Sequence, residues 1–369
     1  MTTQRIPQRL TTPQSLIAAG LAEPERLPEL EAVARRYAIG LTPALAALVR
    51  PEDPSDPIAR QFVPDPRELI RDPAERDDPI GDDAMSPVKG LVHRYPDRVL
   101  IKLVAVCAVY CRFCFRRERV GPGSGTLSAG EFAAAIDYVR AHEGIWEVIL
   151  TGGDPLTLSP RRIAEATQAL AGIDHVKVLR WHTRLPVAAP EQVTKAVARA
   201  LMAEGKTTVV AVHANHAREL TESARSACRR LAAEGAMLVS QSVLLKGVND
   251  DPETLIDLMR AFVEARVKPY YLHHGDLAPG TAHWRVSIAR GQELMRLLRA
   301  RLSGLATPTY MLDIPGGHGK APIGPQWIHC GEDGEHVVTD PQGIQHGYAD
   351  RLGADSAHIA DSTAVETVN

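Results

Sequence analysis

The sequence has few cysteines, no long apolar run and little net charge. Five of its 369 residues are cysteine, and this small, odd number argues against a disulfide framework and for a reducing compartment. No stretch approaches the roughly 20 consecutive apolar residues that span a membrane, and the first residues lack the apolar core of a secretory signal. A net charge of -3 gives a nucleic-acid partner no electrostatic support. We therefore expect a soluble cytoplasmic protein, with no membrane and no nucleic acid among its partners.

Three of the five cysteines crowd into one short stretch. Cys107, Cys111 and Cys114 follow directly after the apolar run 99–106, with three and then two residues between them. Thiolates bind iron or zinc, and this spacing allows three sulfurs to converge on one point. A structural zinc site usually has four protein ligands, so three thiolates leave one coordination position for a substrate or cofactor. The alternatives are buried structural cysteines and one half of a zinc site.

From residue 99 onward the sequence alternates between two kinds of segment. Apolar, β-branched runs of strand length are separated by amphipathic segments of helix length. Such a repeat indicates an α/β fold with a parallel sheet covered by helices, either closed partly into a barrel or open and doubly wound. The expected strands are 99–106, 147–150, 176–181, 207–212, 237–241, 268–272 and 309–313. The expected helices are 13–19 and 29–37 before the repeat, and 128–142, 159–170, 191–203, 222–234, 252–265 and 288–302 within it.

The regions on either side of this repeat have a different composition. Residues 1–90 are rich in Pro, Asp, Glu and Arg, and we expect 51–83 to wrap over another surface while supplying little core of its own. Near the other end, 336–339 belongs to a weak strand-like pair, and 354–369 is expected to be disordered. We therefore expect a helical and extended accessory region at 1–90, a core domain at 91–325 and a tail at 326–369.

Each expected strand ends in a cluster of polar side chains. Chemistry in parallel α/β folds lies at the carboxyl ends of the strands, where the following loops meet. A cluster after every strand therefore indicates one active-site mouth. The clusters are Cys107–Cys114, Thr151–Asp154, His182–Arg184, His213–His216, Gln241, His273–Asp276, and Asp313 with Gly316–Lys320.

A pair of glycines and a pair of arginines each allow both a functional and a structural interpretation. Gly152 and Gly153 follow an apolar strand, where they either let the backbone approach a ligand or form an ordinary turn. Arg94 and Arg98 stand just before the first strand of the repeat. They either hold a phosphate group or keep the surface soluble.

Three charged residues at the ends of the last strands also allow alternatives. Lys320 ends a glycine-rich loop that lacks the spacing of a phosphate-binding P-loop. It can form a Schiff base with a carbonyl compound or be a solvated lysine. Asp276 and Asp313 can bind a cation together, or they can serve as helix caps and salt-bridge partners.

Taken with its surroundings, the cysteine motif resembles the lysine 2,3-aminomutase family of radical S-adenosylmethionine (SAM) enzymes, which also use pyridoxal 5′-phosphate (PLP). The resemblance extends from about residue 51 to 325. It implies a partial (β/α)6-type barrel and a [4Fe-4S] cluster that is held by the three cysteines and binds SAM at its fourth iron. The matching segments are 86–100, the cysteine motif with Tyr110 and Arg112, 150–154, 241–250, 269–271 and 313–320.

The resemblance also implies roles for individual residues. Lys320 would form the Schiff base with PLP, and Arg116 would hold the α-carboxylate of the substrate. Asp276 and Asp313 would receive the ε-ammonium of lysine, because two carboxylates balance a buried ammonium but repel a glutamate side chain. The implied PLP-binding residues are Arg94, Tyr95, Arg98 and Gln241, and the implied SAM-binding residues are Gly152, Gly153, Asp154 and His213.

The implied activity is that of an isomerase that moves the α-amino group of L-lysine to the β-carbon, with reduced flavodoxin or ferredoxin as electron donor. Alternatives of the same chemistry are a β-lysine-forming enzyme that serves elongation factor P and an aminomutase for another amino acid. An alternative of another class is a non-catalytic iron–sulfur protein that transfers electrons, which would need no Lys320. The chain continues past Lys320 to Asn369, which favours the enzyme acting on free lysine, and the resemblance allows a homo-oligomer.

The sequence departs from the family pattern at two places. His318 stands in a loop that is otherwise glycine, where it would narrow the site or add a proton donor. Some family members bind zinc through cysteines near the C-terminus. Outside the cysteine motif this chain has only Cys228 and Cys330, so we expect no such zinc site.

Overall fold

The computed structural model describes residues 8–331 and 334–350. The chain divides into two units, Met1–Gly324 and Pro325–Asn369. The expected disorder of 354–369 lies outside the described residues. In the two described ranges, no helix is both long enough and apolar enough to cross a membrane.

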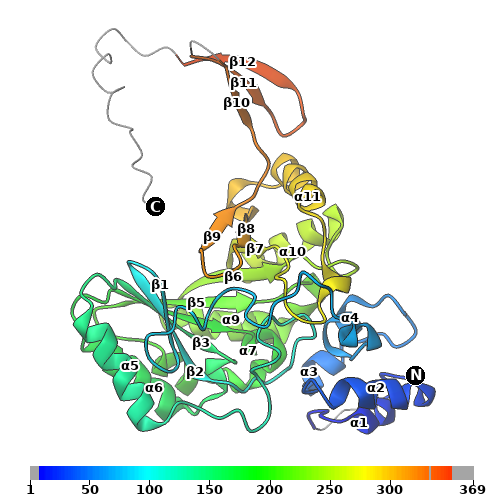
Figure 1. Ribbon diagram of the computed structural model, residues 1–369, viewed down its shortest axis with the longest axis vertical. Coiled ribbons are helices and arrows are strands. Elements are labelled where there is room, and N and C mark those ends of the chain that lie inside the picture. Colours follow the sequence, from blue (N-terminus) through cyan, green and yellow to red (C-terminus); the bar gives the residue numbers. More distant parts are fainter. Residues whose placement is uncertain (1–7, 332–333, 351–369) are drawn as a thin grey trace. The chain divides into compact units, whose positions relative to one another are not determined.

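The first unit is built on one nine-stranded sheet whose strands follow chain order (Figure 1). Neighbouring strands from β2 to β8 are parallel, and the edge strands β1 and β9 pair antiparallel with β2 and β8. The curled sheet confirms the predicted α/β fold with a partial barrel. The strands are β1 (Leu91–Tyr95), β2 (Arg98–Val104), β3 (Glu147–Gly152), β4 (Val178–Thr183), β5 (Thr207–His213), β6 (Met237–Val243), β7 (Lys268–His273), β8 (Thr309–Asp313) and β9 (Lys320–Pro322).

The predicted strands of this sheet are all present, and in it only the two edge strands were not predicted from the sequence. β8 has the predicted bounds, and the other predicted strands differ from β2 to β7 only at their ends. β1 and β9 are short and carry polar residues, so neither shows an apolar run or a clear alternation.

The helices between the strands begin close to the expected residues, with one exception. Ser128 and Glu131 form a capping box at the start of the helix expected over 128–142, and the Ser159 side chain accepts a hydrogen bond from the Arg162 amide. The prediction of one helix over 191–203 is wrong, because Thr194 caps a new, shorter helix after a break. The helices are α5 (Ala129–Ala141), α6 (Pro160–Ala171), α7 (Leu185–Ala188), α8 (Lys195–Ala200), α9 (Glu222–Ala233), α10 (Pro252–Glu264) and α11 (Ile288–Arg301).

One large hydrophobic cluster joins the sheet to these helices. Val99, Leu150 and Leu179 from the strands, together with Leu231 and Phe262 from the helices, are all fully buried in it. Burying such a side chain stabilises the fold by about 1.5–3 kcal/mol. The opposite face of the sheet carries a much smaller apolar cluster, formed by Val178, Val209, Ala211 and Val239.

The N-terminal region has a smaller hydrophobic cluster of its own. Leu16, Leu41 and Phe62 are fully buried in it, and α3 packs beside α7 of the barrel. Residues 51–83 supply Ile58 and Phe62 to this cluster, so the expectation that this segment adds little core is only partly right. The helices are α1 (Pro13–Ala18), α2 (Leu27–Ala34), α3 (Pro43–Ala46) and α4 (Pro57–Phe62), with 3-10 turns at Pro24–Arg26 and Pro66–Leu69.

The second unit is a three-stranded antiparallel sheet. Its strands are β10 (Ile328–Cys330), β11 (Glu335–Thr339) and β12 (Gln345–Ala349). The sequence predicts a weak strand-like pair that includes 336–339, and the structure adds a third strand.

Candidate active site

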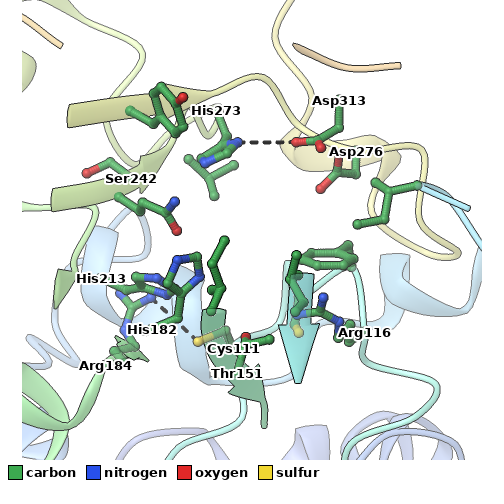
Figure 2. Close-up of a pocket in the computed structure, with 18 of the residues that line it drawn as sticks. Cys111, Arg116, Thr151, His182, Arg184, His213, Ser242, His273, Asp276 and Asp313 are labelled. Atoms are coloured by element: carbon green, nitrogen blue, oxygen red, sulfur yellow. Dashed lines mark hydrogen bonds and ion pairs between the residues drawn. The ribbon is translucent and has the colours of Figure 1, made fainter. Parts of the chain in front are cut away.

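With the exception of His318, every residue for which the sequence predicts a role lines one cavity of about 430 Å³. The cavity lies inside the curve of the sheet and reaches the carboxyl ends of its parallel strands. Figure 2 shows Cys111 and Arg184 on one side of it and Asp276 and Asp313 on the other. The structure thus brings together the residues that the strand-end argument groups, while their individual roles stay predictions. They are Arg94, Tyr95, Arg98, Cys107, Cys111, Cys114, Arg116, Gly152, Gly153, Asp154, His213, Gln241, Asp276, Asp313 and Lys320.

The three cysteines of the motif lie in the loop after β2. Burial raises the pKa of the Cys111 thiol to about 11 and raises the pKa of both Cys107 and Cys114, so the thiols favour their neutral form. The Arg184 guanidinium lies 3.5 Å from the Cys111 sulfur. In residues 8–331 and 334–350, no three His, Cys, Asp or Glu side chains form a site for a single metal ion. Three thiols in one cavity wall, with an arginine beside them, fit an iron–sulfur cluster, whose positive iron would replace the protons.

A buried carboxylate from the N-terminal region fixes this loop from behind. Glu68 is fully buried and accepts hydrogen bonds from Arg112 at 2.6–3.1 Å and from Arg117. The Arg117 guanidinium also lies over the Tyr37 ring, 3.6 Å from its centroid. Because Arg112 and Arg117 flank Cys114, Glu68 sets the path of the cysteine loop.

The glycines after β3 serve a close contact between backbones. A Cβ atom on Gly152 or Gly153 would clash with the carbonyl oxygens of Val104 or Val106. Gly152 also has a φ of +113°, a conformation that favours glycine. The two glycines therefore allow the chain that follows β2 to pack closely against the end of β3, and both also line the cavity. Their role in binding SAM stays a prediction.

Asp154 is likewise engaged by the protein itself. Its carboxylate accepts hydrogen bonds from the Thr183 hydroxyl at 2.7 Å and from the Arg184 amide at 2.8 Å. Burial raises the pKa of Asp154, and these hydrogen bonds oppose the effect. Asp154 therefore fixes the end of β4 beside the cysteine loop, and a contact with SAM would come in addition to this structural role.

Two partly buried histidines meet in the cavity wall at the ends of β4 and β5. The rings of His182 and His213 lie edge to face with centroids 5.6 Å apart. Burial lowers the pKa of His213 to about 3 and lowers the pKa of His182 strongly, so both rings are neutral. The Nε2 atom of each is buried without a hydrogen-bond partner in the described part of the chain. The family resemblance implies that His213 binds SAM, whereas no role was predicted for His182.

Gln241 follows an irregularity in the pairing of β6 with β7. The register shifts between Ser240 and Gln241, where a regular strand would have continued. Such a bulge turns the next side chain to a new direction, and Gln241 lines the cavity.

The hairpin of β1 and β2 brings two arginines and a tyrosine to the cavity wall. The Nη2 atom of Arg94 donates to the Ile80 carbonyl at 2.7 Å. The Arg98 guanidinium lies 3.7 Å from the centroid of the Tyr95 ring. Arg94, Tyr95 and Arg98 all line the cavity, and guanidinium groups bind phosphate through charge-assisted hydrogen bonds, so these residues suit the phosphate of PLP.

Lys320 stands opposite Asp313 because of strand register. The two residues are direct partners in the β8–β9 pairing, and the Lys320 ammonium forms an ion pair with Asp313. His273 contacts the other oxygen of the same carboxylate at 3.3 Å (Figure 2). Burial would raise the pKa of Asp313, but the contacts with His273 and Lys320 outweigh it and hold the pKa well below the usual range.

Asp276 is the unpaired member of this acidic end. Its side chain makes no hydrogen bond or ion pair with any residue that the structure describes. Burial and the nearby charge of Asp313 raise its pKa to about 7. The site therefore holds one carboxylate that is already balanced and one that lacks a cation.

The residues at which the sequence departs from the family pattern do not line this cavity. His318 is exposed and is not among the residues that line the cavity, so the expectation that it narrows the site is wrong. Cys228 is buried in the main hydrophobic cluster, and Cys330 is exposed in β10.

Four further residues shape the site, and the sequence assigned no individual role to any of them. Asp82 and Glu68 come from the Pro- and Asp-rich segment, where an acidic residue is unremarkable. His182 and His273 lie in strand-end clusters that the analysis singled out, so their position at strand ends was the available signal.

The comparisons with known proteins agree with this geometry. Residues 101–259 match the model of the radical SAM superfamily. The chain is 40% identical over 306 residues to a putative L-lysine 2,3-aminomutase of Aquifex aeolicus, covering 82% of this chain and 83% of that protein. It is 35% identical over 314 residues to the L-lysine 2,3-aminomutase of Clostridium subterminale, covering 85% and 75%. It is also 35% identical over 299 residues to the glutamate 2,3-aminomutase of Clostridioides difficile, covering 81% and 70%. The chain therefore belongs to the lysine 2,3-aminomutase family of radical SAM enzymes.

Proposed function

We propose that this enzyme moves the α-amino group of L-lysine to the β-carbon and so forms β-lysine. When bound, the [4Fe-4S] cluster and SAM supply a radical, and PLP supplies the π system that carries the migrating amino group. Cys107, Cys111 and Cys114 would hold the cluster. The observation that supports lysine as the substrate is the ion pair between the Lys320 ammonium and Asp313, because it shows that Asp313 can bind an ammonium group.

The acidic end of the cavity suits a terminal ammonium. The Lys320 ammonium on Asp313 is chemically the same group as the end of a lysine substrate. When Lys320 turns to bond the cofactor, Asp313 loses its cation, and the substrate ammonium can take that place. Asp276, whose pKa is raised to about 7 by burial and by Asp313, would be ionised by the same ammonium.

The same charges disfavour an acidic substrate. A glutamate side chain would bring a third carboxylate to Asp276 and Asp313, and like charges in a buried site repel strongly. One relative is named for glutamate, so the substrate does not follow from family membership alone. We therefore assign lysine on the basis of the two aspartates.

The opposite end of the substrate would bind Arg116. Its guanidinium lies in the cavity over the Phe115 ring, 4.4 Å from the centroid. An arginine can bind a carboxylate through two parallel hydrogen bonds. Arg116 at one end and the aspartates at the other would orient lysine while burial excludes water from the reacting carbons.

The supply of electrons and the place of action are further parts of the proposal. Reduced flavodoxin or ferredoxin would give the cluster its electron, and the free cysteines suit the reducing cytoplasm where these carriers work. Accessory residues 1–90 and core residues 91–325 would act together, since both line the cavity.

The test is anaerobic reconstitution with iron, sulfide, PLP and SAM, followed by product analysis for several amino acids. We expect β-lysine from lysine and little product from glutamate, ornithine or alanine. Preferential turnover of glutamate would contradict the assigned substrate. Mass spectrometry after borohydride reduction should find PLP attached at Lys320. Absence of PLP from every lysine would favour an electron-transfer protein instead.

A further inference from the structure

A turn of the N-terminal region packs directly against the loop that precedes Lys320. We call residues 80–86 the strap. Gly81 in the strap has a φ of +71°, and a Cβ atom there would clash with the backbone of Gly316 and Gly317. A Cβ on Gly317 would in turn lie 3.2 Å from the Met85 side chain. The strap and the glycine loop therefore fit each other without room for a side chain between them.

Asp82 points from this strap to two arginines of the site. Its carboxylate accepts hydrogen bonds from Arg94 at 3.2 Å and from Nε and Nη2 of Arg116 at 3.2 and 3.1 Å. Lys102 lies 3.7 Å away, and the Asp82 side chain is only 6% exposed. Burial would raise the pKa of Asp82, but Arg116, Lys102 and Arg94 outweigh it and lower the pKa. The carboxylate is therefore ionised and balances guanidinium groups that would otherwise repel each other.

The way Asp82 binds Arg116 leaves one end of the guanidinium free. Asp82 takes the edge formed by Nε and Nη2, and the Phe115 ring lies against the face. Nη1 has no hydrogen-bond partner in the described ranges. A guanidinium fixed by its edge and its face can present its remaining end to a carboxylate without a search over rotamers.

We propose that Asp82 is a positioning residue that orients Arg116 toward the α-carboxylate of the substrate. This inference rests on the proposed function, because it assumes an amino-acid substrate. It assigns the strap a role in recognising α-amino acids, since a ligand without a carboxylate gains nothing from an oriented Arg116. Arg94 depends less on Asp82, because the Ile80 carbonyl also holds it.

The experiment compares two ligands on reconstituted, anaerobic enzyme. L-lysine and 1,5-diaminopentane share the terminal amine, but the diamine lacks the carboxylate. The variants are Asp82→Ala, the isosteric Asp82→Asn, and Asp83→Asn as a control. Asp83 is exposed, pairs with Arg119 and does not line the cavity. Binding is followed through the absorbance of PLP, and PLP content is measured in each variant.

We expect Asp82→Ala to weaken lysine binding about tenfold to hundredfold, the value of a hydrogen bond to a charged group. Binding of the diamine should change little, and Asp82→Asn should fall between Asp82→Ala and the wild type for lysine. Asp83→Asn should match the wild type with both ligands. The KM for lysine should rise more than kcat falls, because the interaction is already made in the bound ground state.

Two results would overturn the inference. Equal weakening of lysine and diamine by Asp82→Asn would mean that Asp82 only stabilises the fold. Lysine binding that is unchanged or tighter in Asp82→Ala would mean that its negative charge merely competes with the substrate carboxylate. A wild-type enzyme that binds neither ligand would contradict the proposed function itself, and the inference with it.

Discussion

The β-α core and the N-terminal segment 51–90 are held in place by different forces. In the core, buried apolar side chains such as Leu150 and Leu179 join the sheet to its helices. The N-terminal segment attaches largely through buried carboxylates, each of which binds arginines of the barrel. The pairs are Asp56 with Arg218, Glu68 with Arg112 and Arg117, Glu75 with Arg285, and Asp82 with Arg94 and Arg116.

The two kinds of contact have different consequences for the protein. Hydrophobic burial stabilises the folded state but has no preferred direction, so it does not fix the orientation of any one side chain in the site. A charge-assisted hydrogen bond has a length and an angle, so Glu68 and Asp82 decide where the arginines beside the site point. We infer that substitutions in the core alter the free energy of unfolding, whereas substitutions of the carboxylates alter the site in a folded protein.

The largest effect is expected at Cys111, which we propose as a ligand of the cluster. Cys111→Ala should abolish cluster assembly and all turnover while the fold remains, because two thiolates cannot hold the cubane with one iron left open. The measurements are iron content, anaerobic absorption and circular dichroism. Retained iron–sulfur absorption, or continued cleavage of SAM, would show that Cys111 is not a ligand.

The second prediction tests whether Glu68, in the N-terminal segment 51–90, orients the loop that carries the three cysteines. Glu68→Ala leaves Arg112 and Arg117 buried without their partner, and breaking such a pair costs about 3–5 kcal/mol. We expect the folded variant to load less iron than the wild type.

The control for Glu68→Ala is a substitution that shortens an apolar side chain in the hydrophobic core. Leu179→Ala should cost about 2–5 kcal/mol of stability. Its folded fraction should nevertheless load iron normally, because no contact near the cysteines is lost. If both variants loaded iron equally well once folded, the distinction between the two regions would fail.

Asp313→Asn should weaken the use of lysine while sparing the cleavage of SAM. The substrate ammonium would lose one of two buried carboxylates, which costs about 3–5 kcal/mol, or about two to four orders of magnitude in kcat/KM. Binding of PLP should persist, since Arg94, Tyr95 and Arg98 lie elsewhere in the cavity. Normal kcat/KM for lysine in this variant would refute the ammonium pocket.

The smallest effect concerns pH. Burial and the charge of Asp313 raise the pKa of Asp276 to about 7, while Lys320 and Arg116 oppose the shift. Asp276 is therefore protonated below this pH and ionised above it, and an ammonium binds the ionised form better. The KM for lysine should fall as pH rises from 6 to 8, by at most about tenfold per pH unit below the pKa. Asp276→Asn should remove this dependence, and a dependence that survived would exclude Asp276 as its cause.

Much of the fold and of the site could be predicted because the signals are local. The alternation of apolar and amphipathic segments located the strands from β2 to β8, and Ser128 and Ser159 marked two helix starts. The cysteine spacing, the glycine loop and the strand-end clusters pointed to many of the residues that line the cavity, while the roles of Tyr95 and Arg116 came from the family resemblance. The helix expected over 191–203 failed because Thr194 caps a new helix there, an effect that outweighs apolar periodicity.

Local sequence signals specify which elements form and which chemical groups are available. Which charges meet depends on the three-dimensional fold, because Glu68 and Asp82 are separated along the chain from the arginines that they bind. The fold also decided that Asp313 is shared by His273 and Lys320, that Gly152 faces Val104, and that His318 lies outside the cavity. Backbone periodicity depends on neighbours within a few residues, whereas an ion pair depends on the distance between atoms in space. That distance is set only when the sheet curls around the cavity and the N-terminal region packs against it.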